Sequence, residues 1–145
     1  MKRLLRAYRG APDVLCAVLA SAGLVIDAVV HLRLASNYDP VGGTISQGAL
    51  FRVEAVVALA AAAAVLVTPW RRAAYALALL VAASAFGAVM LYRYVNVGSL
   101  GPLPNMYEPV WFGQKTLTAY AEAGAALSAA AGLLLGPRRR GSAHT

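Results

Sequence analysis

The fold is decided by residues 27–54, DAVVHLRLASNYDPVGGTISQGALFRVE. We interpret this stretch as the outer end of one membrane helix, a short loop, and the outer end of the next helix. Its helical parts are apolar except for Asp27, His31, Arg33, Arg52 and Glu54. A charged side chain near the centre of a membrane helix costs about 2.5–3.5 kcal/mol on insertion scales, so it usually faces a partner or a cavity. The stretch therefore predicts a membrane hairpin with a polar site near its outer end.

The composition indicates that the chain lies in lipid. Of its 145 residues 60% are hydrophobic and 13% are charged, and the mean hydropathy is +0.63. A soluble domain averages about 25% charged residues, and one membrane span needs roughly 20 apolar residues. We therefore predict an all-α bundle of four transmembrane helices in one integral membrane domain, with helices at about 13–34, 48–68, 73–95 and 113–135 and a basic, disordered tail at 136–145.

The basic residues predict the topology. Of the Lys and Arg residues, four precede the first apolar run, two lie between the second and third runs, and three follow the fourth run. In a chain that crosses four times, all of these lie on one side, and the positive-inside rule makes that side cytoplasmic. We expect a multi-pass cell-membrane protein with both termini in the cytoplasm. Since the positive charge follows the helix flanks, we expect no nucleic-acid partner.

A weak internal repeat suggests two tandem helical hairpins of the same orientation. Glu54 precedes Pro69 by fifteen residues, Glu122 precedes Pro137 by the same interval, and arginines follow each proline. Parallel repeats of this kind occur in membrane proteins. With or without the repeat, this spacing puts Glu54 and Glu122 at about the same depth.

Polar side chains are layered along the predicted helices. Arg33, Arg52, Arg93 and Lys115 each lie near the outer end of a different helix. One layer deeper lie the acidic residues of the spans, Asp27, Glu54 and Glu122. The inner half is expected to hold no ionisable group except Cys16, a single thiol that cannot form an intrachain disulfide.

Helical spacing predicts which of these side chains share a face. Asp27 and His31 are separated by four residues and lie within reach of each other. Lys115, Thr118 and Glu122 form a second stripe, and Gln47, Phe51 and Glu54 a third. If the three stripes face inward, they converge on a cavity that binds a small polar or anionic ligand or a lipid-like headgroup. The candidate ligand-binding residues are Asp27, His31, Arg52, Glu54, Arg93, Lys115 and Glu122.

Other interpretations of the charges remain open. Arg33 or Arg52 paired with a buried carboxylate would give structural ion pairs and no ligand site. One histidine with three carboxylates is in principle able to bind iron or manganese. However, the second histidine, His144, lies in the tail, and no Glu-x-x-His pair of a di-iron site is present, so we assign no metal. No catalytic motif is present, which favours a protein that is not an enzyme.

The hairpin also carries a resemblance. His31-Leu32-x-Leu34, Tyr38 and Ile45-x-x-Gly48-x-Leu50-Phe51 resemble a pattern in small four-helix membrane proteins of actinobacteria. The arrangement is similar, more distantly, to the DoxX-like family, some of whose members are linked to quinone-dependent redox systems. The resemblance implies the four-helix architecture. Two further functions stay open: an accessory or assembly subunit of a larger membrane complex or homo-oligomer, and a quinone-linked redox component.

Overall fold

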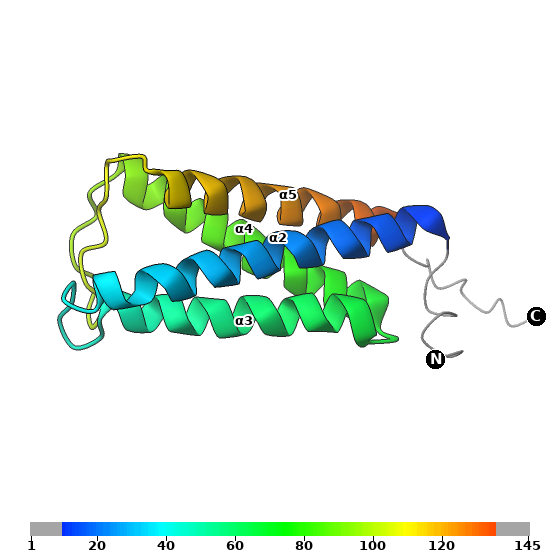
Figure 1. Cartoon of the computed structure of the whole chain (residues 1–145), viewed down its shortest axis with the longest axis horizontal. Coiled ribbons are helices and arrows are strands. Elements are labelled where there is room, and N and C mark those ends of the chain that lie inside the picture. Colours follow the sequence, from blue (N-terminus) through cyan, green and yellow to red (C-terminus); the bar gives the residue numbers. More distant parts are fainter. Residues whose placement is uncertain (1–9, 136–145) are drawn as a thin grey trace, which may run out of the picture.

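Four long α-helices form the chain in the computed structural model, which describes residues 10–135. They are α2 (Ala11–Ala35), α3 (Gln47–Val67), α4 (Arg71–Tyr94) and α5 (Gly113–Leu135), and a short 3-10 helix, η1 (Ser36–Tyr38), follows α2 (Figure 1). All four are long and apolar enough to cross a membrane. The predicted all-α bundle of four spans is confirmed, and each predicted helix boundary lies within two residues of the observed one. The predicted disordered tail, with Pro137 of the repeat, lies outside the described residues.

Local sequence explains where the helices begin and end. Pro12 and Asp13 occupy the first turn of α2, where a missing N–H and a negative charge are both favourable. Ser46 caps α3, because its hydroxyl oxygen accepts a hydrogen bond from the N–H of Ala49 at 3.1 Å. Pro69 follows α3 and prevents the helix from continuing.

The helices form a ring in which each packs against its two neighbours. α2 packs extensively on α3 and α5, α4 packs on α5 and more lightly on α3, and α2 and α4 lie diagonally opposite. The connections 36–46 and 95–112 lie together at one end, which we call the two-loop end (Figure 1). The turn 68–70, the start of α2 and the end of α5 lie at the other, the one-turn end.

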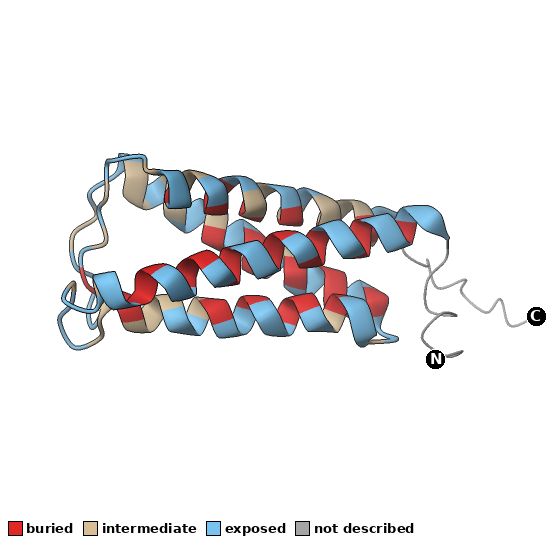
Figure 2. Cartoon of the chain, viewed as in Figure 1, coloured by how far each residue is buried: buried red, intermediate tan, exposed pale blue. Residues whose placement is uncertain are grey.

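The buried residues of the helices face the centre of the bundle and the exposed ones face outward (Figure 2). Alanine is the commonest buried residue in each of the four helices, whereas Leu127 and Leu134 are 74% and 85% exposed. A Cβ on Gly23 would lie 2.6 Å from the carbonyl oxygen of Ala121, so α2 and α5 are in backbone contact there. Close approach through small residues, with an apolar exterior, is how helices pack in lipid.

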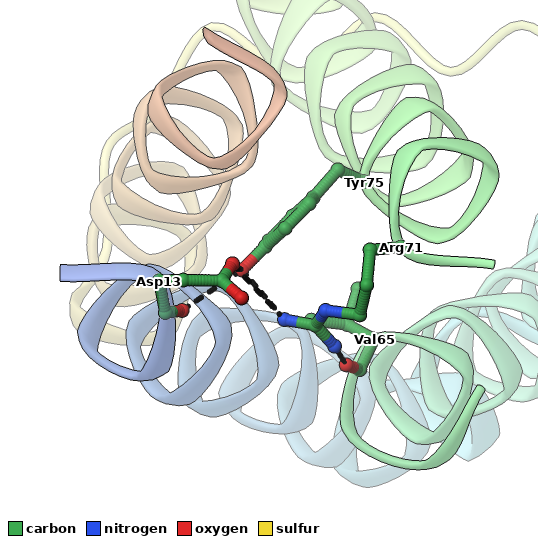
Figure 3. A network of polar contacts seen from close by, with 4 residues as sticks. All are labelled: Asp13, Val65, Arg71 and Tyr75. Carbon is green, nitrogen blue, oxygen red and sulfur yellow. Dashed lines mark hydrogen bonds and ion pairs between the residues drawn. The ribbon is translucent and has the colours of Figure 1, made fainter. Parts of the chain in front are cut away.

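A buried polar network joins three helices at the one-turn end (Figure 3). The Tyr75 hydroxyl donates to the Asp13 carboxylate at 2.7 Å and lies 2.9 Å from the Asp13 carbonyl oxygen. Arg71 donates from Nη2 to the Tyr75 hydroxyl at 2.8 Å, forms an ion pair with Asp13 at 3.3 Å, and donates from Nη1 to the carbonyl oxygen of Val65. The network thus links α2, the end of α3 and α4.

This network corrects the expectation that the inner half holds no ionisable group except Cys16. Asp13 and Arg71 are 5% and 4% exposed. Arg71 is one of the two basic residues between the second and third apolar runs, yet the start of α4 turns it inward while its neighbour Arg72 stays exposed. The expectation failed because a residue count at a helix end does not give the direction in which each side chain points.

We predict that Arg71→Met destabilises the bundle and that Arg72→Met does not. Removing one partner of a buried ion pair typically costs about 3–5 kcal/mol, because the remaining charge stays buried. The measurement is thermal unfolding of both variants in the same detergent. The two variants lose the same charge at adjacent positions, so equal melting temperatures would show that the network contributes nothing to stability.

Candidate functional site

The last turns of α2 carry the first part of the site. His31 Nδ1 lies 2.8 Å from Asp27 Oδ1 and 3.0 Å from the Asp27 carbonyl oxygen. Asp27 is fully buried and His31 is 9% exposed. The spacing of four residues therefore brings the two side chains together as expected. The Phe51 ring of α3 packs nearly perpendicular to the imidazole, with 4.9 Å between ring centres.

α5 supplies the second part. Thr118 Oγ1 lies 2.8 Å from Asp27 Oδ1 and 3.3 Å from Glu122 Oε1. Glu122 is fully buried and Thr118 is 4% exposed. One hydroxyl thus stands between two carboxyl groups from helices that are far apart in sequence. This contact fixes α2 against α5 at the depth of Asp27.

Three carboxyl oxygens in this region have no hydrogen-bond partner among the described residues. They are Asp27 Oδ2, Glu122 Oε2 and Glu54 Oε1, and each is shielded from solvent. Buried polar atoms in native proteins nearly always have a partner, and an exception calls for an explanation. The cluster of Asp27, His31, Thr118 and Glu122 therefore has unused binding capacity.

A cavity of about 410 Å³ opens beside the cluster. His31 and Thr118 form part of its wall, together with Glu54 from α3. These three residues lie within about two helical turns of the two-loop end, at a depth of up to roughly 10 Å from the helix ends. Most of the remaining wall is apolar or aromatic: Val30, Leu34, Tyr38, Leu50, Phe51, Val53, Ala85, Ala88, Val89, Tyr92, Leu103, Met106 and Phe112.

The two loops meet over this cavity. Ile45 N–H donates to the Pro102 carbonyl oxygen at 3.2 Å, and the Glu108 N–H donates to the Tyr92 carbonyl oxygen at 3.0 Å. The Tyr38 hydroxyl donates to Glu108 Oε2 at 3.4 Å. Leu103 and Met106 of the longer loop line the cavity as a result. The loop 95–112 is therefore part of the binding wall.

The structure does not bring Arg52 to this cavity. Its guanidinium forms a two-point contact with Asp39, with Nη1 2.6 Å from Oδ1 and Nη2 2.8 Å from Oδ2. Both side chains are nearly half exposed. The hydrogen bonds from Arg52 hold the pKa of the Asp39 carboxyl below its usual value. Arg52 thus closes the loop 36–46 onto α3, outside the cavity wall.

The other two cations of the predicted site differ from each other. The Arg93 guanidinium lies 5.0 Å from the ring centre of Tyr94 and 5.6 Å from that of Trp111, outside the cavity wall. Lys115 does line the cavity and is 8% exposed, but its ammonium donates to the Glu108 carbonyl oxygen and lies 5.5 Å from the Trp111 ring centre. The cations are thus held mainly by protein groups near the loops.

The alternative of arginine–carboxylate locks can also be compared with the structure. Arg33 is exposed and Arg52 pairs with Asp39. Within residues 10–135, Asp27, Glu54 and Glu122 form no ion pair with arginine or lysine. Charge neutralisation by a basic side chain therefore does not account for the cluster in the described part of the chain.

Sequence reasoning missed most of the cavity wall. Thr118 was placed on the stripe with Glu122 but not among the candidate residues, although it touches both carboxyl groups. Its spacing of four residues from Glu122 was the available signal. Leu103 and Met106 belong to a loop without helical periodicity, so no sequence pattern placed them near the site.

Comparisons of the chain with protein-family models, with curated proteins and with solved structures found no match.

We predict that Thr118→Val lowers the stability of the bundle by about 1–3 kcal/mol, because the buried carboxyl oxygens lose their hydroxyl partner. Thr118→Ser keeps the hydroxyl and should retain most of the stability. Thr116→Val is the matched control two residues earlier on α5, on a half-buried position outside the cluster. Thermal unfolding in detergent measures all three. Equal losses for the variants at 116 and 118 would contradict a specific role for the hydroxyl.

Proposed function

We propose that this integral membrane protein is a binding protein, and that its cavity at the two-loop end holds a small amphiphilic molecule. The observation that carries the proposal is the cavity of about 410 Å³, whose wall is largely apolar and carries a few polar residues, His31, Glu54 and Thr118 together with Gln47, Glu108 and Lys115. Ligand pockets are typically about 300–1,000 Å³, mostly apolar, with a small number of polar groups that orient the ligand.

The distribution of polarity favours an amphiphile over a free polar ion. His31, Glu54 and Thr118 supply polar atoms at the deep part of the wall, whereas valine, leucine and aromatic side chains cover most of the rest. A fully charged small anion would leave its hydration shell for an apolar wall, which is costly without paired cations. A ligand with an apolar body and one hydrogen-bonding group matches both parts of the surface.

The aromatic side chains of the cavity wall support a second candidate ligand, a quinone. Tyr38, Phe51, Tyr92 and Phe112 all line the cavity beside His31. Flat rings are accommodated by such walls through stacking and edge contacts. A quinone headgroup is therefore a ligand that this cavity is suited to hold, and a protein that binds it would be a component of a quinone-linked redox system.

The proposed orientation has both termini in the cytoplasm and the two-loop end outside, so that the ligand reaches the cavity from the outer leaflet or the outer solution. The basis is the pair of arginines, Arg71 and Arg72, that directly follows the turn 68–70, together with the basic flanks of the sequence. The two loops at the opposite end contribute fewer basic residues.

A cysteine-labelling experiment tests the orientation. We expect Thr44→Cys, in the exposed loop 36–46, to react with a membrane-impermeant maleimide added to intact cells. Trp70→Cys, at a position that is 78% exposed in the one-turn end, should react only after the membrane is opened. The native Cys16 is buried in both variants. The reverse labelling pattern would overturn the proposed topology.

A cavity-filling substitution tests the binding function. Ala88 lines the cavity, and Ala83 is exposed on the same helix without lining it. After purification and detergent washing, mass spectrometry of organic extracts should find one amphiphile enriched with the wild-type protein. Ala88→Phe should reduce that amount at least about tenfold by occupying its space, and Ala83→Phe should leave it unchanged.

The outcomes separate the candidates. A quinone in the extract supports the redox component, and another amphiphile supports the general binding protein. If no molecule is enriched, or if both alanine variants retain it equally, the cavity is not a binding site. Stable co-purification of a second membrane protein with no enriched molecule would favour an accessory or assembly subunit.

A further inference from the structure

We propose that Asp27, His31 and Glu122 bind a divalent transition-metal ion beside the deep part of the cavity. Each of these residues offers one ligand atom, and the three atoms lie within 4.8 Å of one another. Asp27 and Glu122 are fully buried and His31 is 9% exposed. This site goes beyond the proposed binding of an amphiphile, because its ligand and its test are separate and, of its three residues, His31 alone also lines the cavity.

The first argument is the hydrogen-bond capacity of the cluster. Thr118 Oγ1 lies within hydrogen-bond distance of both Asp27 Oδ1 and Glu122 Oε1, but a hydroxyl has one hydrogen and donates to one acceptor at a time. Asp27 Oδ2 and Glu122 Oε2 receive no hydrogen bond from another described residue, and the two carboxyl groups can hydrogen-bond to each other only when one of them is protonated. A cation bound between the two carboxylates would use the capacity that the protein leaves unused.

The second argument is charge. Two carboxylates inside a low-dielectric bundle repel each other, and an isolated buried charge is costly. Within residues 10–135, no lysine or arginine pairs with either of them. A divalent ion with two carboxylates and a neutral imidazole is an electrically neutral group. Metal binding therefore removes the electrostatic cost of the cluster without any further cation.

The third argument is the orientation of His31. Both neighbours of Nδ1 are Asp27 oxygens, the carbonyl at 3.0 Å and the carboxylate at 2.8 Å, so Nδ1 carries a hydrogen in the metal-free protein. A metal ion between Nδ1 and the Asp27 carboxylate takes the place of this hydrogen, because ligands bind a metal in their deprotonated form. Nε2 points away from Asp27, so an ion bound there would lie too far from the Asp27 carboxylate to share it as a ligand.

Size and ligand type indicate the class of metal. Two ligands at about 2.1 Å from one ion are at most about 4.2 Å apart, so side-chain shifts of less than about 1 Å bring the three atoms into place. One imidazole nitrogen with two carboxylate oxygens suits zinc, manganese or iron better than the oxygen-only metals calcium and magnesium. Of the three ligands, His31 also lines the cavity.

Zinc binding tests the site directly. The full chain, purified without a histidine tag and with His144→Ala to remove the tail histidine, is dialysed against buffered Zn²⁺ after detergent washing. Elemental analysis should find one zinc ion per chain. Zinc should also raise the melting temperature, since a ligand that binds only the folded state stabilises it.

Ligand variants locate the ion. Glu122→Gln and Asp27→Asn keep the side-chain shape and should each weaken zinc binding at least about tenfold. Asp39→Asn is the matched control, because it removes a carboxylate at the two-loop end outside the cavity wall. It should leave zinc binding and the zinc-induced shift of the melting temperature unchanged. Elution volume and melting temperature without zinc report whether each variant is folded.

Clear results would overturn the site. Absence of stoichiometric zinc in the folded parent protein contradicts it, as does equal zinc binding by the parent and a folded Glu122→Gln variant. In those cases the two buried carboxyl groups share a proton instead. The amphiphile experiment is unaffected by that result, because it is read from organic extracts and from the substitution at Ala88.

Discussion

The contact between Asp27, Thr118 and Glu122 sets the depth and the relative rotation of α2 and α5. In the hydrocarbon core of a bilayer no water is available to hydrogen-bond a polar group, so its partner must lie inside the protein. Two carboxyl groups fully buried at one crossing point therefore require that their helices meet there. Gly23 permits this meeting, because it brings the backbone of α2 to that of α5 one turn away from Asp27.

The two ends of the bundle satisfy this requirement in different ways. At the one-turn end, Asp13 has Arg71 and Tyr75 as partners, so a cation and a hydroxyl compensate the carboxylate (Figure 3). At the two-loop end, the carboxyl groups of Asp27 and Glu122 share a threonine, Asp27 also contacts His31, and one oxygen of each carboxyl group receives no hydrogen bond from another described residue. A network with its own cation serves to hold helices together. A cluster that lacks one, beside a cavity, has the chemistry of a site that binds something.

Much of this arrangement was predictable from the sequence. Apolar length gave four helices, and the four-residue spacings of Asp27 with His31 and of Thr118 with Glu122 gave the two halves of the cluster. The partner of Arg52 was not predictable, because it depends on how η1 and the following loop place Asp39 beside α3. Helical periodicity predicts which side chains share a face of one helix. The contact between Arg52 and Asp39 depends instead on the path of an irregular loop, which periodicity does not describe.

The position of the cavity likewise depends on both the helices and an irregular loop. Ala85 and Ala88 on α4 are too short to fill the space opposite His31 and Phe51, and α2 and α4 are diagonal and barely touch. Leu103 and Met106 of the loop 95–112 form part of the cavity wall. The helices thus fix the depth of the cavity and most of its polar groups, and the loop 95–112 contributes to its wall. Selectivity for one amphiphile over another must therefore depend on this loop as well as on the charged residues that first drew attention to the site.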